Sequence, residues 1–285
     1  MDLNSSEAIK SICKKYKVKP QSWKGQNFLV DQEVLEKIVA AADLKKDDTA
    51  LEVGPGFGIL TKELAQRVKK VIAVEIDRNI VEALKTILKD YKNVEIIEGD
   101  ILRLQIANCK LQIGFKIVAN IPYSITGKFL RKILESEMKP SEMVLLVQKE
   151  VAERIIAKAG KMSLLALSVQ FYSQTEIIVY VSRESFFPEP GVDSAIIKFK
   201  ILSQTELNDK NQISNINEKE FFRIAKIGFS SPRKQLHNNL SAGLKISDDQ
   251  IKNIFKELNF NFQIRAQELS VEDWKNLLFK IKSLL

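Results

Sequence analysis

The stretch LEVGPGFGILT, residues 51–61, joins a strand-like run to a helix-like run through a loop with three glycines. Residues 49–54 include Ala, Leu and Val and predict a buried strand, whereas the residues from Ile59 onward carry apolar side chains at helical spacing. Gly54, Gly56 and Gly58 allow the backbone to turn tightly and to approach a ligand closely. A strand, a glycine loop and a helix in this order are typical of α/β folds that bind a nucleotide at the start of the helix.

Similar strand-like runs recur on the C-terminal side of this stretch. They span residues 70–76, 93–99, 115–120 and 142–148. Their near-continuous Val, Ile and Leu content indicates strands that are buried on both faces, as in a parallel sheet. Because helical patterns separate them, the sequence predicts an open, doubly wound, Rossmann-like α/β sheet. Two later strands, 175–182 and 194–201, follow each other without a long helix, so we expect an antiparallel, hairpin-like edge.

The C-terminal part of the chain has a different character. Residues 203–220 are polar, lack periodicity and are rich in Asn, Gln and Ser, which predicts a linker. Four helix-like segments follow, at residues 218–229, 232–242, 247–258 and 270–283. We therefore expect an α/β domain over residues 1–203, with a basic N-terminal arm, and a small all-helical, RNA-binding domain over residues 204–285.

Composition excludes several classes of protein. The 285 residues are 45% hydrophobic, which suffices for a core, but no apolar run approaches the roughly 20 residues that cross a bilayer. The N-terminus lacks an apolar signal core, so we expect a cytoplasmic protein without a membrane partner. Cys13 and Cys109 lie far apart and His237 is the single histidine, which argues against a Cys/His metal site. We expect no metal, and we interpret His237 as a surface residue.

The positive charge is concentrated on the two flanks. The net charge is +8; residues 1–30 hold six Lys against two acids, and residues 203–285 hold thirteen Lys and Arg against ten acids. Such flanks suit a polyanionic partner held over a nearly neutral middle. The cations expected to contact phosphates are Lys14, Lys15, Lys17, Lys19, Arg233 and Lys234.

Polar residues follow four successive strands, where an open α/β sheet binds its ligand. After the glycine loop come Glu75, Asp100 and the segment NIPY (120–123). Glu75 stands about 20 residues after the glycines, where an acid accepts from ribose hydroxyls, and Asp100 suits an adenine amino group. These residues indicate an adenosine cofactor and leave NAD and S-adenosylmethionine open. Ile59 occupies the position of the third glycine in G-x-G-x-x-G, which disfavours NAD.

The segment NIPY favours one of the two cofactors. Pro122 fixes its own φ and pushes Ile121 toward an extended shape, so the Ile121 carbonyl points in a fixed direction. Asn120 supplies a second acceptor, and two acceptors can hold both hydrogens of an exocyclic amine with its lone pair aimed at a methyl group. Tyr123 offers a face for a stacked base, worth roughly 1–3 kcal/mol. Hydride transfer needs none of these groups, so the segment favours methyl transfer from S-adenosylmethionine.

With these residues the chain closely resembles the KsgA-type small-subunit ribosomal RNA adenine dimethyltransferases. The likeness runs through GQNFLVD (25–31), LEVGPGFGILT (51–61), VEID (74–77), GDIL (99–102), NIPY (120–123), LVQKEVAERI (146–155), FFPEPGVDSAII (186–197) and FSSPRKQLHNNL (229–240). It implies dimethylation of N6 on two adjacent adenines near the 3′ end of small-subunit rRNA during ribosome assembly, with S-adenosylmethionine as cofactor. We expect a monomer.

The resemblance also assigns roles to residues. The implied cofactor-binding residues are Gln26, Asn27, Leu29, Gly54, Gly56, Glu75, Asp100 and Asn120. Of these, Asn120 would serve both the cofactor and the target amine. Tyr123 would lie under the target base and Phe186 would close over it, with Phe187 as the less favoured aromatic.

Two other readings compete with this one. An Erm-type enzyme, which methylates a large-subunit rRNA adenine and confers macrolide resistance, shares NIPY. The helical stretches RKQLHNNL and RAQELSVEDW favour the small-subunit enzyme instead. A non-catalytic RNA-binding assembly factor on the same fold would be expected to lose Asn120 or Tyr123, and both are present. Departures from the family pattern, such as Gly191 and Pro232, bear on RNA affinity and target choice.

Overall fold

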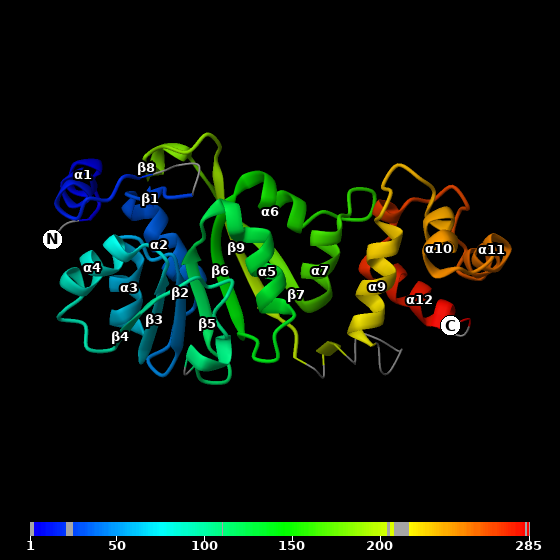
Figure 1. Ribbon diagram of the computed structural model, residues 1–285, viewed down its shortest axis with the longest axis horizontal. Coiled ribbons are helices and arrows are strands. Elements are labelled where there is room, and N and C mark those ends of the chain that lie inside the picture. The colour runs from blue at the N-terminus through cyan, green and yellow to red at the C-terminus, as the bar shows by residue number, and fades with distance from the viewer. Residues whose placement is uncertain are drawn as a thin grey trace. The chain divides into compact units, whose positions relative to one another are not determined.

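The computed structural model describes residues 3–20, 25–109, 111–203, 206–207, 217–282 and 284 (Figure 1). The chain forms two compact units. The sheet unit comprises residues 1–152 and 174–201, and the helical unit comprises residues 153–173 and 202–285. No helix in the described part of the chain is long and apolar enough to cross a membrane.

The sequence predicts residues 153–173 in the first domain, whereas the structure groups them with the helical unit. Helix α7 (Leu164–Tyr172) belongs to the helical unit, where it contacts α9 (Glu218–Gly228) and α12 (Val271–Lys282). The rings of Phe171 and Phe221 lie 4.4 Å apart between their centroids. This aromatic packing joins residues that are far apart in the sequence, so the linear pattern does not reveal it.

The sheet unit is built on one seven-stranded sheet. Its order is β4-β3-β2-β5-β6-β9-β7. In chain order the strands are β2 (Thr49–Val53), β3 (Lys70–Glu75), β4 (Val94–Glu98), β5 (Lys116–Asn120), β6 (Glu142–Gln148), β7 (Ser173–Val181) and β9 (Ser194–Ile201). The pairs from β4 to β6 are parallel, whereas β6 and β9 are antiparallel. The predicted Rossmann-like sheet is confirmed, and β9 lies inside β7 at the edge.

Helices cover both faces of the parallel part of the sheet (Figure 1). They are α2 (Gln32–Ala41), α3 (Ile59–Arg67), α4 (Arg78–Ile87), α5 (Thr126–Leu134) and α6 (Lys149–Ile155). Carboxylates begin two of them: Asp31 accepts hydrogen bonds from backbone N–H groups of α2, and Asp77 does so for α4. Ile80 and Leu84 on α4 are completely or almost completely buried, as its amphipathic sequence requires.

The N-terminal arm is a packed helix rather than a basic tail alone. Helix α1 (Ser6–Lys15) buries Ile9 and Ile12 in a core cluster with Phe57 and Leu84. The expected cationic residues Lys14, Lys15, Lys17 and Lys19 are exposed. The helix therefore has an apolar face toward the fold and a basic face toward solvent.

A second, unpredicted sheet follows, in which β1 (Phe28–Leu29) pairs antiparallel with β8 (Phe186–Phe187).

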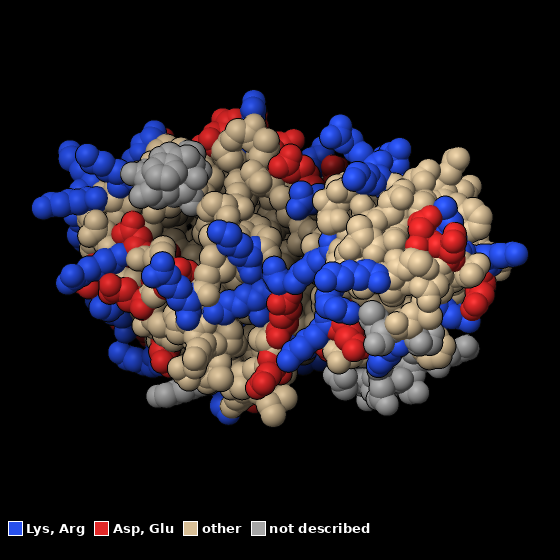
Figure 2. Space-filling view, turned by 45° about the vertical axis from the view of Figure 1, so that its right-hand side comes forward, with Lys and Arg blue, Asp and Glu red and all other residues tan. Residues whose placement is uncertain are grey.

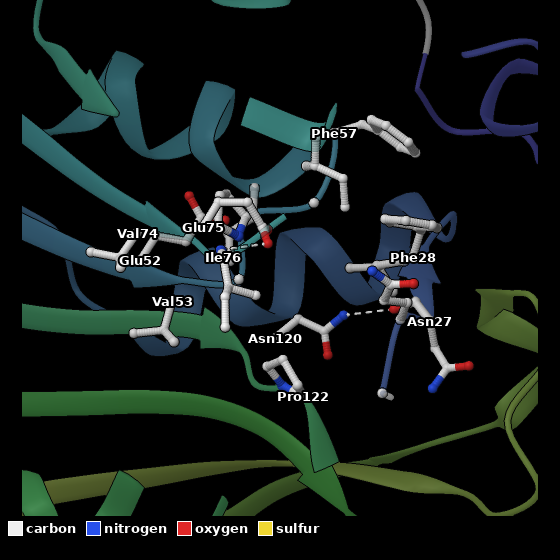
Figure 3. Close-up of a pocket in the computed structure, with 18 of the residues that line it drawn as sticks. Asn27, Phe28, Glu52, Val53, Phe57, Val74, Glu75, Ile76, Asn120 and Pro122 are labelled. Carbon is white, nitrogen blue, oxygen red and sulfur yellow. Dashed lines mark hydrogen bonds between the residues drawn. The ribbon is translucent and has the colours of Figure 1, made fainter. Parts of the chain in front are cut away.

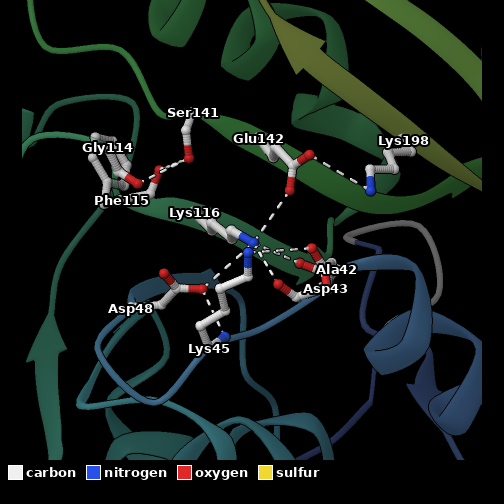
Figure 4. Close-up of polar contacts among 10 residues, drawn as sticks. All are labelled: Ala42, Asp43, Lys45, Asp48, Gly114, Phe115, Lys116, Ser141, Glu142 and Lys198. Atoms are coloured by element: carbon white, nitrogen blue, oxygen red, sulfur yellow. Dashed lines mark hydrogen bonds and ion pairs between the residues drawn. The ribbon is translucent and has the colours of Figure 1, made fainter.

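Lys116 anchors the opposite end of the sheet, at the start of β5 (Figure 4). The side chain is buried, and its Nζ donates to the carbonyl oxygens of Ala42 at 3.0 Å and Asp43 at 2.6 Å. It also pairs with Asp48 at 3.4 Å and with Glu142 at 3.2 Å. The ammonium thus satisfies carbonyls just beyond the end of α2 and is itself neutralised, which makes its burial tolerable.

The helical unit contains the four predicted helices: α9, α10 (Leu236–Leu244), α11 (Asp248–Glu257) and α12. Helix α10 begins at residue 236 rather than 232, because residues 229–235 form a loop. The buried Asn239 holds that loop, since its Nδ2 donates to the carbonyls of Gly228 at 2.7 Å and Ser231 at 3.1 Å. Most of the predicted linker lies outside the described residues.

His237 is not a surface residue, contrary to the sequence-based interpretation. Only 5% of it is exposed. Its Nδ1 lies 2.5 Å from Asp248 Oδ1 and its Nε2 lies 2.8 Å from Gln235 Oε1. The ring therefore connects α10 to the first residue of α11.

Candidate active site

A cavity of about 380 Å³ opens at the carboxyl ends of β2, β3 and β5 (Figure 3). The strand order reverses here, because β3 lies on one side of β2 and β5 on the other. This is the position at which open α/β sheets bind their ligands. All eight predicted cofactor-binding residues line the cavity: Gln26, Asn27, Leu29, Gly54, Gly56, Glu75, Asp100 and Asn120.

The glycine loop needs its glycines. Gly54 has φ +67° and Gly56 has φ +56°, which other residues rarely adopt. A Cβ on Gly54 would lie 3.2 Å from Cδ of Pro122, and a Cβ on Gly56 would lie 2.9 Å from the ring of Phe28. The loop backbone therefore lies close to the NIPY turn and to β1, and Gly54 and Gly56 line the cavity without side chains.

Two acids lie at neighbouring strand ends. Glu75 is 6% exposed, and its Oε1 accepts from the backbone N–H groups of Ile76 at 2.8 Å and Asp77 at 3.0 Å. Burial raises the pKa of Glu75, and these N–H groups oppose the rise. Asp100 Oδ1 accepts from Leu102 N at 2.9 Å. Ile76, which is 68% exposed, adds an apolar side chain to the cavity lining.

Glu52 is a cavity residue that the sequence reasoning missed. It is 1% exposed, and burial raises its pKa to about 8, against a smaller lowering by the Thr61 hydroxyl. Its Oε2 has no hydrogen-bond partner among the described residues, and neither has Oδ1 of the buried Asn27, which lines the same cavity. Two orphaned acceptors in one cavity suit a ligand that brings donors. The sequence did contain a sign of this role, because Glu52 is the single acid of its buried strand and stands two residues before Gly54.

Asn120 ends β5 at the cavity, as predicted (Figure 3). Its Nδ2 donates to the backbone carbonyl of Asn27 at 3.1 Å, so the amide oxygen remains as the acceptor. Ile121 is buried, and its N–H donates to Leu146 O at 3.2 Å, which fixes the Asn120–Ile121 peptide. The turn thus presents a side-chain oxygen with a defined orientation.

Tyr123 and Phe186 do not line the cavity. Tyr123 is half-buried beside it, between the lining residues Pro122 and Ser124, and its hydroxyl lies 2.6 Å from Ser194 Oγ. Burial raises the pKa of Tyr123. Phe186 is 3% exposed and belongs to the core cluster that includes its strand partner Leu29. The structure therefore places Phe186 beside the lining residue Leu29 and not in the cavity wall itself.

Apolar residues complete the cavity, and the sequence reasoning missed them as well. Phe28 and Phe57 both line it, with ring centroids 4.6 Å apart. Leu3 and Ile9 reach it from α1 and its preceding residues. Phe187 lies on the same cluster, with Lys10 Nζ 5.2 Å from its ring centroid. The N-terminal helix thus forms part of the cavity wall.

Comparisons with known proteins agree with this geometry. Residues 18–282 match the family described as ribosomal RNA adenine dimethylase. Ribosomal RNA small subunit methyltransferase A of Dehalococcoides mccartyi strain CBDB1 is 44% identical over 269 residues, which cover 94% of this chain and 90% of that protein.

Two solved structures share the fold over most of the chain. A dimethyladenosine transferase from Plasmodium falciparum is 28% identical with a TM-score of 0.74, covering 90% of this chain and 98% of that one. The 23S rRNA methyltransferase ErmE is 24% identical with a TM-score of 0.69, covering 90% and 100%, and this likeness shows the fold alone. The family match over almost the whole length, together with the identity to the curated relative, shows that the chain belongs to the ribosomal RNA adenine dimethylase family.

Proposed function

We propose that this protein transfers methyl groups from S-adenosylmethionine to N6 of two adjacent adenines near the 3′ end of small-subunit rRNA, during ribosome assembly. The observation that carries the proposal is the amide of Asn120. Its nitrogen is held by the Asn27 carbonyl at the cavity, so its oxygen can accept from a substrate amine. The small-subunit target follows the name of the curated relative.

The cavity residues fit the cofactor. Glu75 would accept from the ribose hydroxyls and Asp100 from the adenine amino group, with Ile76 against the base. The orphaned oxygens of Glu52 and Asn27 would accept from the α-ammonium of the methionine part, which supplies the donors that both lack. When bound, S-adenosylmethionine supplies an electrophilic methyl group on its sulfonium.

The NIPY turn would orient the target. The Asn120 amide oxygen and the Ile121 carbonyl would accept the two hydrogens of N6, and the nitrogen lone pair would then face the methyl group. Tyr123 would stack on the target base. Phe186 stays a predicted closing aromatic, and its burial in the core makes it the least supported of these residues.

The reaction needs no histidine base. The histidine of this chain lies in the helical unit, and no histidine lines the cavity. The attacking nitrogen becomes cationic on methylation and loses its proton readily afterwards, so positioning is the main task of the protein. At saturating S-adenosylmethionine we expect no inflection of the His type near pH 6.5.

We infer a monomer that acts in the cytoplasm, where its proposed substrate is assembled. The experiment that tests the function uses ribosomal subunits from a strain that lacks the modification. The protein is incubated with methyl-labelled S-adenosylmethionine and either small or large subunits, and the labelled bases are mapped. We expect two adjacent dimethylated adenines in the small-subunit RNA. Label in the large subunit alone would support the Erm-type activity, and no label with either subunit would support the non-catalytic alternative.

A further inference from the structure

Two loops of the helical unit lie side by side and form one surface, which we call the loop pair. It consists of residues 229–235, between α9 and α10, and residues 259–265, after α11. The N–H of Leu236, directly after the first loop, donates to the carbonyl of Ile264 in the second loop at 2.8 Å. Both loops run along the same end of the helical unit in Figure 1.

The loop pair is positively charged and contains no acid. The sequence has no Asp or Glu between Glu220 and Asp248, and none between Glu257 and Glu268. Its cations are Arg233, Lys234 and Arg265, and all three are exposed. No ion pair among the described residues involves Arg233 or Lys234. Their charge is therefore available to a polyanion. Lys and Arg also cover more of the molecular face in Figure 2 than Asp and Glu do.

Hydrogen bonds restrain both loops. Asn239 holds the first loop, and Lys234 N donates to Ser231 O at 2.9 Å. The second loop is a tight turn in which Asn261 accepts twice, from Gln263 N at its Oδ1 (2.8 Å) and from Ile264 N at its carbonyl (3.0 Å). A ring mounted on such a turn loses little freedom when it binds a partner.

The turn directs one aromatic ring inward and the next outward. Phe260 packs against Phe255, with 5.8 Å between ring centroids. Phe262 is 45% exposed and stands two residues from Ile264, where the two loops are joined. The loop pair thus presents an exposed aromatic ring on one loop and the exposed Arg233 and Lys234 on the other.

We propose that Phe262 stacks on an unpaired RNA base, while Arg233 and Lys234 contact phosphates beside it. Single-stranded RNA is bound by such a combination of aromatic faces and cations. The loop pair would then be a base-binding subsite in addition to the NIPY turn that would orient the target adenine. The inference rests on the proposed function, because it requires that the helical unit binds the RNA substrate.

The test measures binding of two RNA probes to the full chain. One is a hairpin with an unpaired adenosine loop that contains 2-aminopurine, and the other is a fully paired duplex of the same length. Phe262→Ala should weaken hairpin binding by about fivefold to a hundredfold and reduce the quenching of 2-aminopurine, because one stacked base is lost. Duplex binding and the salt dependence of affinity should not change, because no phosphate contact is removed.

Matched variants separate stacking from other effects. Phe262→Trp should retain hairpin binding, whereas Phe262→Leu, which stays apolar without an aromatic face, should not. Phe279→Ala removes a ring of α12 that is 56% exposed and lies outside the loop pair, and it should bind both probes like the wild type.

Three results would overturn the proposal: wild-type hairpin affinity in Phe262→Ala, an equal loss on hairpin and duplex, or a loss on intact small subunits but on neither probe, which would indicate a protein contact. The double variant Arg233→Ala/Lys234→Ala distinguishes this failure from failure of the proposed function. If the double variant weakens RNA binding and reduces the salt dependence of affinity while Phe262→Ala leaves RNA binding unchanged, only the stacking inference is wrong. If both leave all binding unchanged, RNA docking by this unit falls too.

Discussion

The hydroxyl oxygens of Tyr123 and Ser194 lie 2.6 Å apart, so the first residue of β9 holds the ring at the end of the NIPY turn. Ser194 is fully buried, and its place is set by its pairing with Gln148 at the end of β6. The antiparallel strand next to the parallel sheet therefore helps to orient an aromatic side chain at the site. Loss of this hydrogen bond should therefore weaken binding of the target base more than it lowers the free energy of unfolding.

The Tyr123–Ser194 pair can be tested by a double-mutant cycle. Tyr123→Phe and Ser194→Ala should each lower single-turnover methylation of small subunits by less than about tenfold, because one neutral hydrogen bond contributes roughly 0.5–1.5 kcal/mol. Since both changes remove the same contact, the double variant should be little worse than the poorer single variant. Fully additive losses would show that the contact has no part in the reaction.

Glu52 should make the cofactor-free protein less stable as pH rises. Its pKa is about 8 in the folded state, above the ordinary 4.5, so the folded protein keeps a proton that the unfolded chain releases. The free energy of unfolding should therefore fall between about pH 4.5 and 8, by up to about 1.4 kcal/mol per pH unit. Glu52→Gln should lack this part of the slope. Denaturant unfolding of both proteins at pH 5 to 8 measures the difference, and identical slopes would contradict the assignment.

The same carboxyl should influence cofactor affinity. If the ionised Glu52 accepts from the methionine ammonium, the affinity for S-adenosylmethionine should rise with pH up to about 8, and Glu52→Gln should remove that dependence. Calorimetric titration across this range gives the answer, with NAD as a ligand that should not bind to either protein.

Helix α1 should support cofactor binding through its apolar face and RNA binding through its basic face. Ile9 is 2% exposed and lines the cavity, whereas Lys14 is exposed on the same helix. Ile9→Asp should weaken S-adenosylmethionine binding roughly tenfold or more, since burying such a side chain is worth about 1.5–3 kcal/mol. Lys14→Ala should leave that affinity unchanged and lower RNA affinity at low salt. Unaltered cofactor binding in Ile9→Asp would remove α1 from the cavity wall.

The sequence predicted the sheet and a group of residues that line one cavity, because both depend on local pattern. Apolar runs mark the strands, and in a parallel sheet their carboxyl ends meet at one edge, so Glu75, Asp100 and Asn120 converge without further information. The wall formed by α1 was not predicted, because the lysines of that segment indicated a basic arm and its apolar residues were not considered as a buried face. The burial of Phe186 depends on pairing with Leu29, far away in the chain, and no local pattern reports such a pairing.

Phe186 and Phe187 have separable roles. Because Phe186 is a core residue, Phe186→Ala should lower the free energy of unfolding by about 3–5 kcal/mol, and Phe187→Ala, which is half-buried, should cost less. If Phe186 also closes over the target base, Phe186→Leu should fold and still bind RNA poorly. Normal methylation by a folded Phe186→Leu would transfer the closing role to another residue.

Asn120 should be indispensable for methyl transfer but not for folding. Its side chain is partly exposed at a cavity, so the free energy of unfolding of Asn120→Ala should be close to that of the wild type. Loss of one positioned polar group should lower single-turnover methylation by about a hundredfold to a thousandfold. Asn120→Asp provides the sharper comparison. It keeps an acceptor for the amine but replaces the nitrogen that donates to the Asn27 carbonyl at 3.1 Å with a second oxygen. Two oxygens would then face each other, the carboxylate should turn away, and activity should fall although an acceptor is still present. Wild-type activity in Asn120→Asp would show that the Asn27 carbonyl does not orient this side chain.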